Sequence, residues 1–184
     1  MPICLPNFRE ALRCGSEIFQ ALKKILLAKN YSTGVGDEGG FAPNLGSNQE
    51  ACELILEAVE KAGYKAGKEI FLALDSAASS FFKDVKYEFR KSGGGAKNSS
   101  EMLSFYQDLC GKYPICSIED PMDENDWEGF ASVTESLGGQ VQIVGDDLFV
   151  TNTEFVKRGI KESSANAVLI KLNQIGTVSE TVAT

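Results

Sequence analysis

Four apolar runs in this chain each end at a charged side chain. Nearly continuous apolar runs separated by helical stretches are typical of a parallel sheet that is buried on both faces. Sheets of this kind keep their active sites at the carboxyl ends of the strands. We therefore expect three carboxylates and one lysine to converge, as a cation site beside an amine base suited to metal-assisted proton chemistry. The four runs, each with the charged residue that follows it, are Ile70–Leu74 with Asp75, Ile115–Ile118 with Glu119, Val141–Gly145 with Asp146, and Val168–Ile170 with Lys171.

Two helices are expected before the first of these strands. Asn7 and Glu10 have the spacing of a capping box, and apolar residues recur at helical spacing after them. Ser47 and Glu50 mark the start of a second helix, and Gly63 is placed to end it. A glycine-rich loop joins the two, so helix follows helix without a strand between them.

After these helices the pattern becomes a regular alternation of strands and helices. Repeated units of this length predict an α/β fold, either a parallel barrel or a doubly wound sheet. The chain stops inside the fourth unit, whereas a closed eight-stranded barrel typically takes about 250 residues. We expect Lys91–Ser100 to be a flexible surface loop, because its glycines lack the order of a phosphate-binding loop. The helices are expected near Met102–Cys110, at about Trp127–Leu137 and Thr153–Lys161, and from about Val178.

Charge and composition exclude several classes of function. The 184 residues include 18 Lys and Arg against 26 Asp and Glu, which gives a net charge of −8 with no histidine. This acidic balance argues against nucleic acids and anionic membranes as partners, because both need clustered cations. An anionic substrate would need a bound cation to offset the negative charge of the protein. Without histidine, no Ser-His-Asp triad, Cys-His pair or His-ligated zinc site can form.

The cysteines indicate a reducing compartment. Their number is odd and no two have Cys-x-x-Cys spacing, so buried reduced thiols are expected rather than a metal or redox site. The amino terminus lacks the pattern of a signal peptide, and no window reaches the roughly 18 apolar residues of a membrane span. We therefore expect a cytoplasmic protein without a membrane span. The cysteines are Cys4, Cys14, Cys52, Cys110 and Cys116.

Five sequence blocks stand out: GDEGGFAPN at 36–44, LD at 74–75, SIEDP at 117–121, GDDL at 145–148 and IKLNQIGT at 170–177. In order and spacing they resemble the enolase family, the phosphopyruvate hydratases of glycolysis. Five blocks in register are a far more specific signal than a lone glycine motif. The resemblance extends from about Phe8 to the last residue. It implies an incomplete enolase-type TIM barrel, in which two consecutive helices precede parallel strand-helix units and the barrel is not closed.

The resemblance implies a reaction and assigns residues to it. The family removes water from 2-phosphoglycerate to give phosphoenolpyruvate, and its three barrel-end carboxylates hold Mg2+; here they fall on Asp75, Glu119 and Asp146. The lysine that takes the proton from carbon 2 corresponds to Lys171, and the glutamate that assists departure of the carbon-3 hydroxyl corresponds to Glu38. A proton beside a carboxylate is very weakly acidic, so cations at the carboxylate oxygens must assist its removal. Mg2+ suits such a site, because it is a hard cation that binds through carboxylates and substrate oxygens.

The same resemblance indicates that residues 1–184 are a partial barrel domain. Full-length enolases carry an amino-terminal α+β domain before this region and further barrel strands after it, and we expect residues 1–184 to contain neither. They are homo-oligomeric, and some occur at the cell surface. Two functions of different classes remain open: an enolase lyase domain, or a catalytically inactive enolase-like fragment with at most a binding role. On either interpretation we expect this chain alone to convert 2-phosphoglycerate at no measurable rate.

Overall fold

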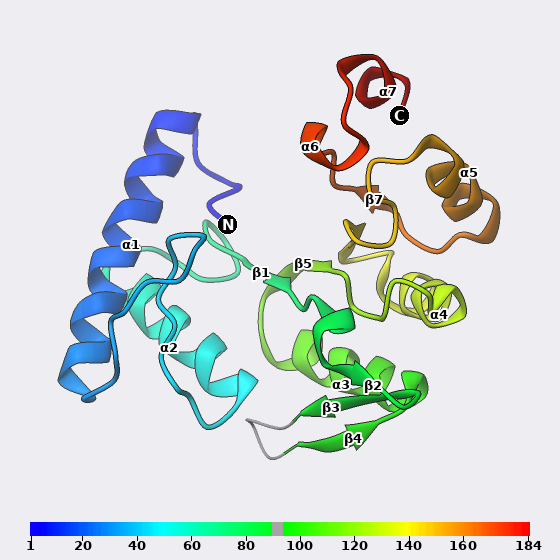
Figure 1. Ribbon diagram of the computed structural model, residues 1–184. Helices are drawn as coiled ribbons and strands as arrows, with labels where there is room; N and C mark the ends of the chain where they lie inside the picture. Colours follow the sequence, from blue (N-terminus) through cyan, green and yellow to red (C-terminus); the bar gives the residue numbers. More distant parts are fainter. Residues whose placement is uncertain (90–93) are drawn as a thin grey trace. The chain divides into compact units, whose positions relative to one another are not determined.

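The computed structural model describes residues 1–89 and 94–184 of the chain (Figure 1). The chain divides into two compact units. Residues 1–72 belong to the first unit, and residues 73–89 and 95–184 form the second. Each unit is built around its own elements, and the four charged strand ends all fall in the second.

The first unit contains the two expected helices, α1 (Phe8–Ala28) and α2 (Asn48–Lys61). The Asn7 side chain accepts the N–H of Glu10 at the start of α1. The Glu10 carboxylate accepts from Arg13, so the capping box predicted there forms only in its first half. Ser47 caps α2 in the same way. Gly63 follows α2 with a φ of 87°, the left-handed conformation that ends helices readily at glycine.

The second unit contains the parallel sheet that the apolar runs predicted. The strand order is β1 (Leu72–Asp75), β5 (Ile115–Glu119), β6 (Gln142–Gly145) and β7 (Ala167–Val168). Strands β5 and β6 pair in parallel, as do β6 and β7. Within the described residues the sheet stays open, with β1 and β7 at its edges. The α/β fold with an unclosed parallel sheet is therefore confirmed.

The helices of the second unit alternate with these strands. They are α3 (Ser99–Lys112), α4 (Trp127–Leu137), α5 (Thr153–Glu162), α6 (Leu172–Ile175) and α7 (Val178–Ala183). Each begins close to its expected position, apart from α6, which the sequence did not predict. Buried apolar side chains fill the core, among them Ile118 and Ile143 from adjacent strands and Phe130 from α4. Burial of both strand and helix faces is what the continuous apolar runs require.

A second, antiparallel sheet was not expected. It consists of β2 (Phe82–Lys83), β3 (Lys86–Phe89) and β4 (Gly95–Lys97), and a short 3-10 helix, η1 (Ala78–Phe81), leads into it. The prediction of a flexible loop at Lys91–Ser100 is therefore wrong for residues 95–100, which form β4 and the capped start of α3. Residues 90–93 lie outside the described residues. Tyr87 of β3 is fully buried, and the rings of Phe81 and Phe82 pack against it.

The thiols agree in part with the expectation of buried, reduced cysteines. Cys14 and Cys52 are buried and free, whereas Cys4 is exposed. Burial raises the pKa of both buried thiols, which keeps them protonated and unreactive. In the part of the chain that the structure describes, no helix has the length and apolar character needed to cross a membrane.

Candidate functional site

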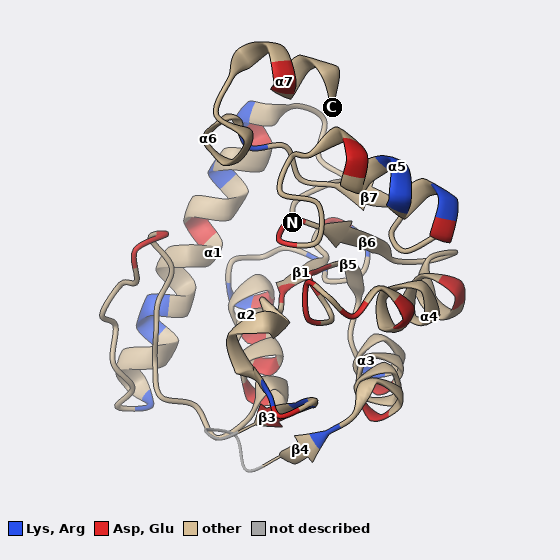
Figure 2. Cartoon of the chain, turned by 45° about the vertical axis from the view of Figure 1, so that its right-hand side comes forward, with Lys and Arg blue, Asp and Glu red and all other residues tan. Residues whose placement is uncertain are grey.

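The charged residues that end the predicted strands lie at one end of the parallel sheet. Asp75 and Glu119 are the last residues of β1 and β5, and Asp146 directly follows β6. Lys171 comes after β7, at the start of α6. Acidic residues, drawn red in Figure 2, surround the ends of β1 and β5. Since parallel strands have their carboxyl ends on the same side, the topology brings these side chains together at the carboxyl ends of the strands.

Three carboxylates come close enough together to share a cation. Oxygens of Glu119, Asp120 and Asp146 all lie within 4.8 Å of one another. Burial, followed by the charges of Asp75, Asp146 and Asp120, raises the pKa of Glu119 to about 7. Burial also raises the pKa of Asp120 to about 6. Like charges held this close in a partly dry environment favour either protonation or a bound cation, so the donor set fits a hard divalent metal ion.

Asp75 is near this group without belonging to it. Its Oδ1 accepts the N–H of Ala77 at 3.1 Å, within the turn that follows β1. Its charge nevertheless contributes to the raised pKa of Glu119. Of the three predicted metal ligands, the structure therefore brings Glu119 and Asp146 together with Asp120 and leaves Asp75 at the margin.

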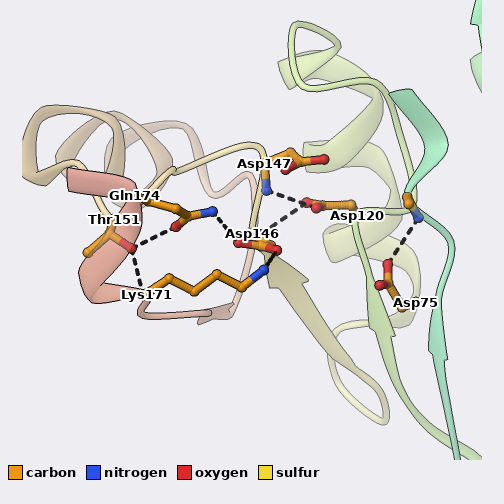
Figure 3. Close-up of polar contacts among 8 residues, drawn as sticks. Asp75, Asp120, Asp146, Asp147, Thr151, Lys171 and Gln174 are labelled. Atoms are coloured by element: carbon orange, nitrogen blue, oxygen red, sulfur yellow. Dashed lines mark hydrogen bonds and ion pairs between the residues drawn. The ribbon is translucent and has the colours of Figure 1, made fainter. Parts of the chain in front are cut away.

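Lys171 lies against the carboxylate group. Its Nζ donates a hydrogen bond to Asp146 Oδ2 and forms an ion pair with it. Gln174 Nε2 donates to the other oxygen, Asp146 Oδ1, at 2.7 Å. Figure 3 shows Lys171 and Gln174 reaching Asp146 from the side opposite to Asp120. The hydrogen bond to Asp146 raises the pKa of the Lys171 amine, so the amine is protonated in this arrangement.

Two polar residues that sequence reasoning missed complete the site. The buried Thr151 donates from Oγ1 to Gln174 Oε1 at 2.8 Å and accepts the N–H of Lys171 at 2.8 Å. Thr151 thus holds both the side chain of Gln174 and the backbone of Lys171. A signal for Gln174 did exist, because it stands three residues after Lys171 at the start of a helix, and that spacing places two residues on one face. Nothing in the sequence pattern marked Thr151.

Glu38, the other predicted catalytic residue, belongs to the first unit and is exposed there. It lies in a tight turn, in which Gly36 donates to the carbonyl of Gly40 at 2.8 Å and Gly39 donates to that of Gly36 at 3.0 Å. Phe41 anchors the turn by stacking on Phe19 of α1, with 4.3 Å between the ring centroids. The first unit therefore presents Glu38 on a short, anchored loop, and its catalytic role stays a prediction.

The comparisons with known proteins point to one family. Residues 1–184 match the family described as the enolase C-terminal TIM barrel domain. Enolase 1 of Methylococcus capsulatus is 60% identical to this chain over 182 residues. These residues are 99% of this chain and 43% of that protein, so the chain spans less than half the length of this relative.

Proposed function

The chain belongs to the enolase family, and on that premise we propose that it carries part of the active site that dehydrates 2-phosphoglycerate to phosphoenolpyruvate with Mg2+. The observation that supports this most is the meeting of Glu119, Asp146 and Lys171 at the carboxyl edge of the sheet. Two acidic groups and an amine on separate strand ends supply the cation ligands and the base that removal of a weakly acidic proton needs.

We assign the cation to Asp75, Glu119 and Asp146. Asp75 lies outside the close group, but its charge acts on Glu119, whereas both carboxylate oxygens of Asp120 already accept backbone N–H groups. Burial and the surrounding carboxylates raise the pKa of Glu119. This supports a bound cation here, because a cation would stabilise the ionised carboxylate. Carboxylate oxygens are the ligands that Mg2+ prefers, and the cluster contains neither sulfur nor imidazole donors that would favour a softer metal. When bound, Mg2+ would supply positive charge that offsets the negative charge developing on the substrate carboxylate.

Lys171 serves in this proposal as the base that accepts the proton from carbon 2. An amine accepts a proton only when it is neutral, so the Lys171 ammonium group must leave its ion pair with Asp146 and release a proton to solvent before it acts as the base. Thr151 holds the Lys171 backbone while the side chain moves. Glu38 then assists the loss of the carbon-3 hydroxyl, because hydroxide is a poor leaving group that needs a proton from a general acid.

We further propose that residues 1–184 form one part of the family's barrel domain, and that 2-phosphoglycerate is the substrate of the whole protein. Homo-oligomer formation and a cytoplasmic location belong to the same proposal. The alternative is an inactive fragment with at most a binding role. The two differ in one respect that can be tested: whether the residues of this chain support turnover when the rest of an enolase surrounds them.

A segment exchange tests this difference. Replacing the matching residues of Enolase 1 from M. capsulatus by this chain should give an enzyme that forms phosphoenolpyruvate only with Mg2+, measured by the ultraviolet absorbance of the enol product. The 60% identity over 182 residues makes a folded chimera the expected outcome. A chimera that melts like its parent but forms no product would favour the inactive fragment.

A further inference from the structure

We propose that Asp120 is a positioning residue, whose carboxylate fixes the backbone at Asp146 and so sets the spacing between Asp146 and Glu119. This inference rests on the proposed metal site. It differs from the assignment of ligands, because Asp120 lies among the clustered carboxylates and is nevertheless given a different task. That task can be read from its hydrogen bonds.

Both carboxylate oxygens of Asp120 accept hydrogen bonds from backbone N–H groups. Oδ1 accepts from Asp146 at 3.0 Å, and Oδ2 accepts from Asp147 at 2.8 Å. Figure 3 shows the Asp120 side chain directed at this stretch of backbone. Asp120 is only 3% exposed and Asp146 only 6%. Buried N–H groups need an acceptor, and an ionised carboxylate makes the stronger, charge-assisted kind of bond.

The backbone of Asp120 ties the same residue to its neighbours. Its N–H donates to the carbonyl of Val144 at 3.0 Å, and its own carbonyl accepts the N–H of Ala78 at 3.1 Å. The pairing of β5 with β6 ends at Glu119 opposite Val144, one residue before Asp120. The side chain of Asp120 therefore continues the connection between the two segments just where the ladder stops.

The conformation of Asp120 supports a positioning role. Its φ is 40°, in the left-handed region that residues other than glycine seldom adopt. Strain of this kind persists where surrounding contacts hold it in place, and here four hydrogen bonds do so. Because Glu119 is the adjacent residue, one side chain determines how the Asp146 backbone lies relative to Glu119.

Amide hydrogen exchange on the metal-free chain, measured by nuclear magnetic resonance, tests the inference. The N–H groups of Asp146 and Asp147 should be protected in the unchanged chain. Asp120→Asn keeps one acceptor and places an NH2 group against the other donor, so at least one of these amides should exchange about 10–100-fold faster. Asp108→Asn, an exposed change of the same type on α3, is the matched control and should leave both amides protected.

A Mn2+ titration of the same three proteins gives the second readout. Asp120→Asn should weaken binding about 10–100-fold, the usual effect of losing a group that orients a metal ligand. Unprotected amides in the unchanged chain would overturn the inference. So would a loss of binding in Asp120→Asn with both amides still protected, because Asp120 would then act as a ligand. If the unchanged chain binds no Mn2+ but its amides respond to Asp120→Asn, the hydrogen-bonding role is supported and the proposed metal site fails.

Discussion

Replacement of Lys171 by alanine in the enolase chimera is expected to lower turnover by a factor on the order of 10²–10⁴, because a positioned general base contributes about that much to proton transfer. Alanine leaves no group that can accept the carbon-2 proton. The measurement is the steady-state rate of phosphoenolpyruvate formation at saturating Mg2+.

Lys157→Ala is the matched control. Lys157 is exposed on α5 and pairs with Glu154 at 2.7 Å, on the helix surface. Its removal should leave turnover unchanged. Lys171→Ala should also retain Mn2+ binding, since the change frees Asp146 from its ion pair. Equal rates in the two lysine variants would contradict the assignment of Lys171 as the base.

The second large effect is expected from Asp146→Asn. The change replaces a carboxylate by a neutral amide within the group of three clustered carboxylates, and it also removes the ion pair with Lys171. We expect Mn2+ affinity to fall by more than about 100-fold, beyond the range that follows from losing a group outside the ligand set. A calorimetric titration of the 184-residue chain measures it.

Asp147→Asn provides the control for charge. It removes the same charge one residue further along, from a residue that is not a member of the close carboxylate group. Its effect on affinity should be several-fold at most. The fluorescence of Trp127, the single tryptophan, verifies that both variants remain folded. Superimposable titration curves for Asp146→Asn and the unchanged chain would show that no metal site is assembled there.

Much of the second unit could be predicted from the sequence because its strands are apolar on both faces. Such apolar runs can be recognised in the sequence without knowing which segments they pair with, and the charged residue after each run marks where the strand ends. The ends of β1 and β5 coincide with Asp75 and Glu119 for this reason. The strand register that places Glu119 opposite Val144 cannot be predicted from the sequence pattern, because it depends on contacts between segments far apart in the chain.

The antiparallel sheet escaped prediction for a local reason. A two-residue turn, Asp84-Val85, joins β2 to β3, and both residues have positive φ, 49° and 61°. Turns of this type usually carry Asn-Gly or Asp-Gly, and a β-branched residue at positive φ gives no such signal. Asp120 is noticeable in the sequence because it lies in the SIEDP block directly beside Glu119, whereas nothing marks Thr151; both have positive φ without being glycine. Their importance lies in which buried groups they reach, and sequence patterns do not record that.

Isotope exchange at carbon 2 shows whether the strand-end residues of this chain carry out proton abstraction. The chimera is incubated with 2-phosphoglycerate and Mg2+ in deuterated solvent, and deuterium at carbon 2 is measured by mass spectrometry alongside product formation. The method separates the step assigned to Lys171 from the later step assigned to Glu38.

Glu38→Gln should retain exchange while product formation falls, because the proton still moves to Lys171 but hydroxide lacks its general acid. Lys171→Ala should lose both exchange and product. Exchange in Lys171→Ala at the rate of the unchanged chimera would show that another group, and not Lys171, is the base.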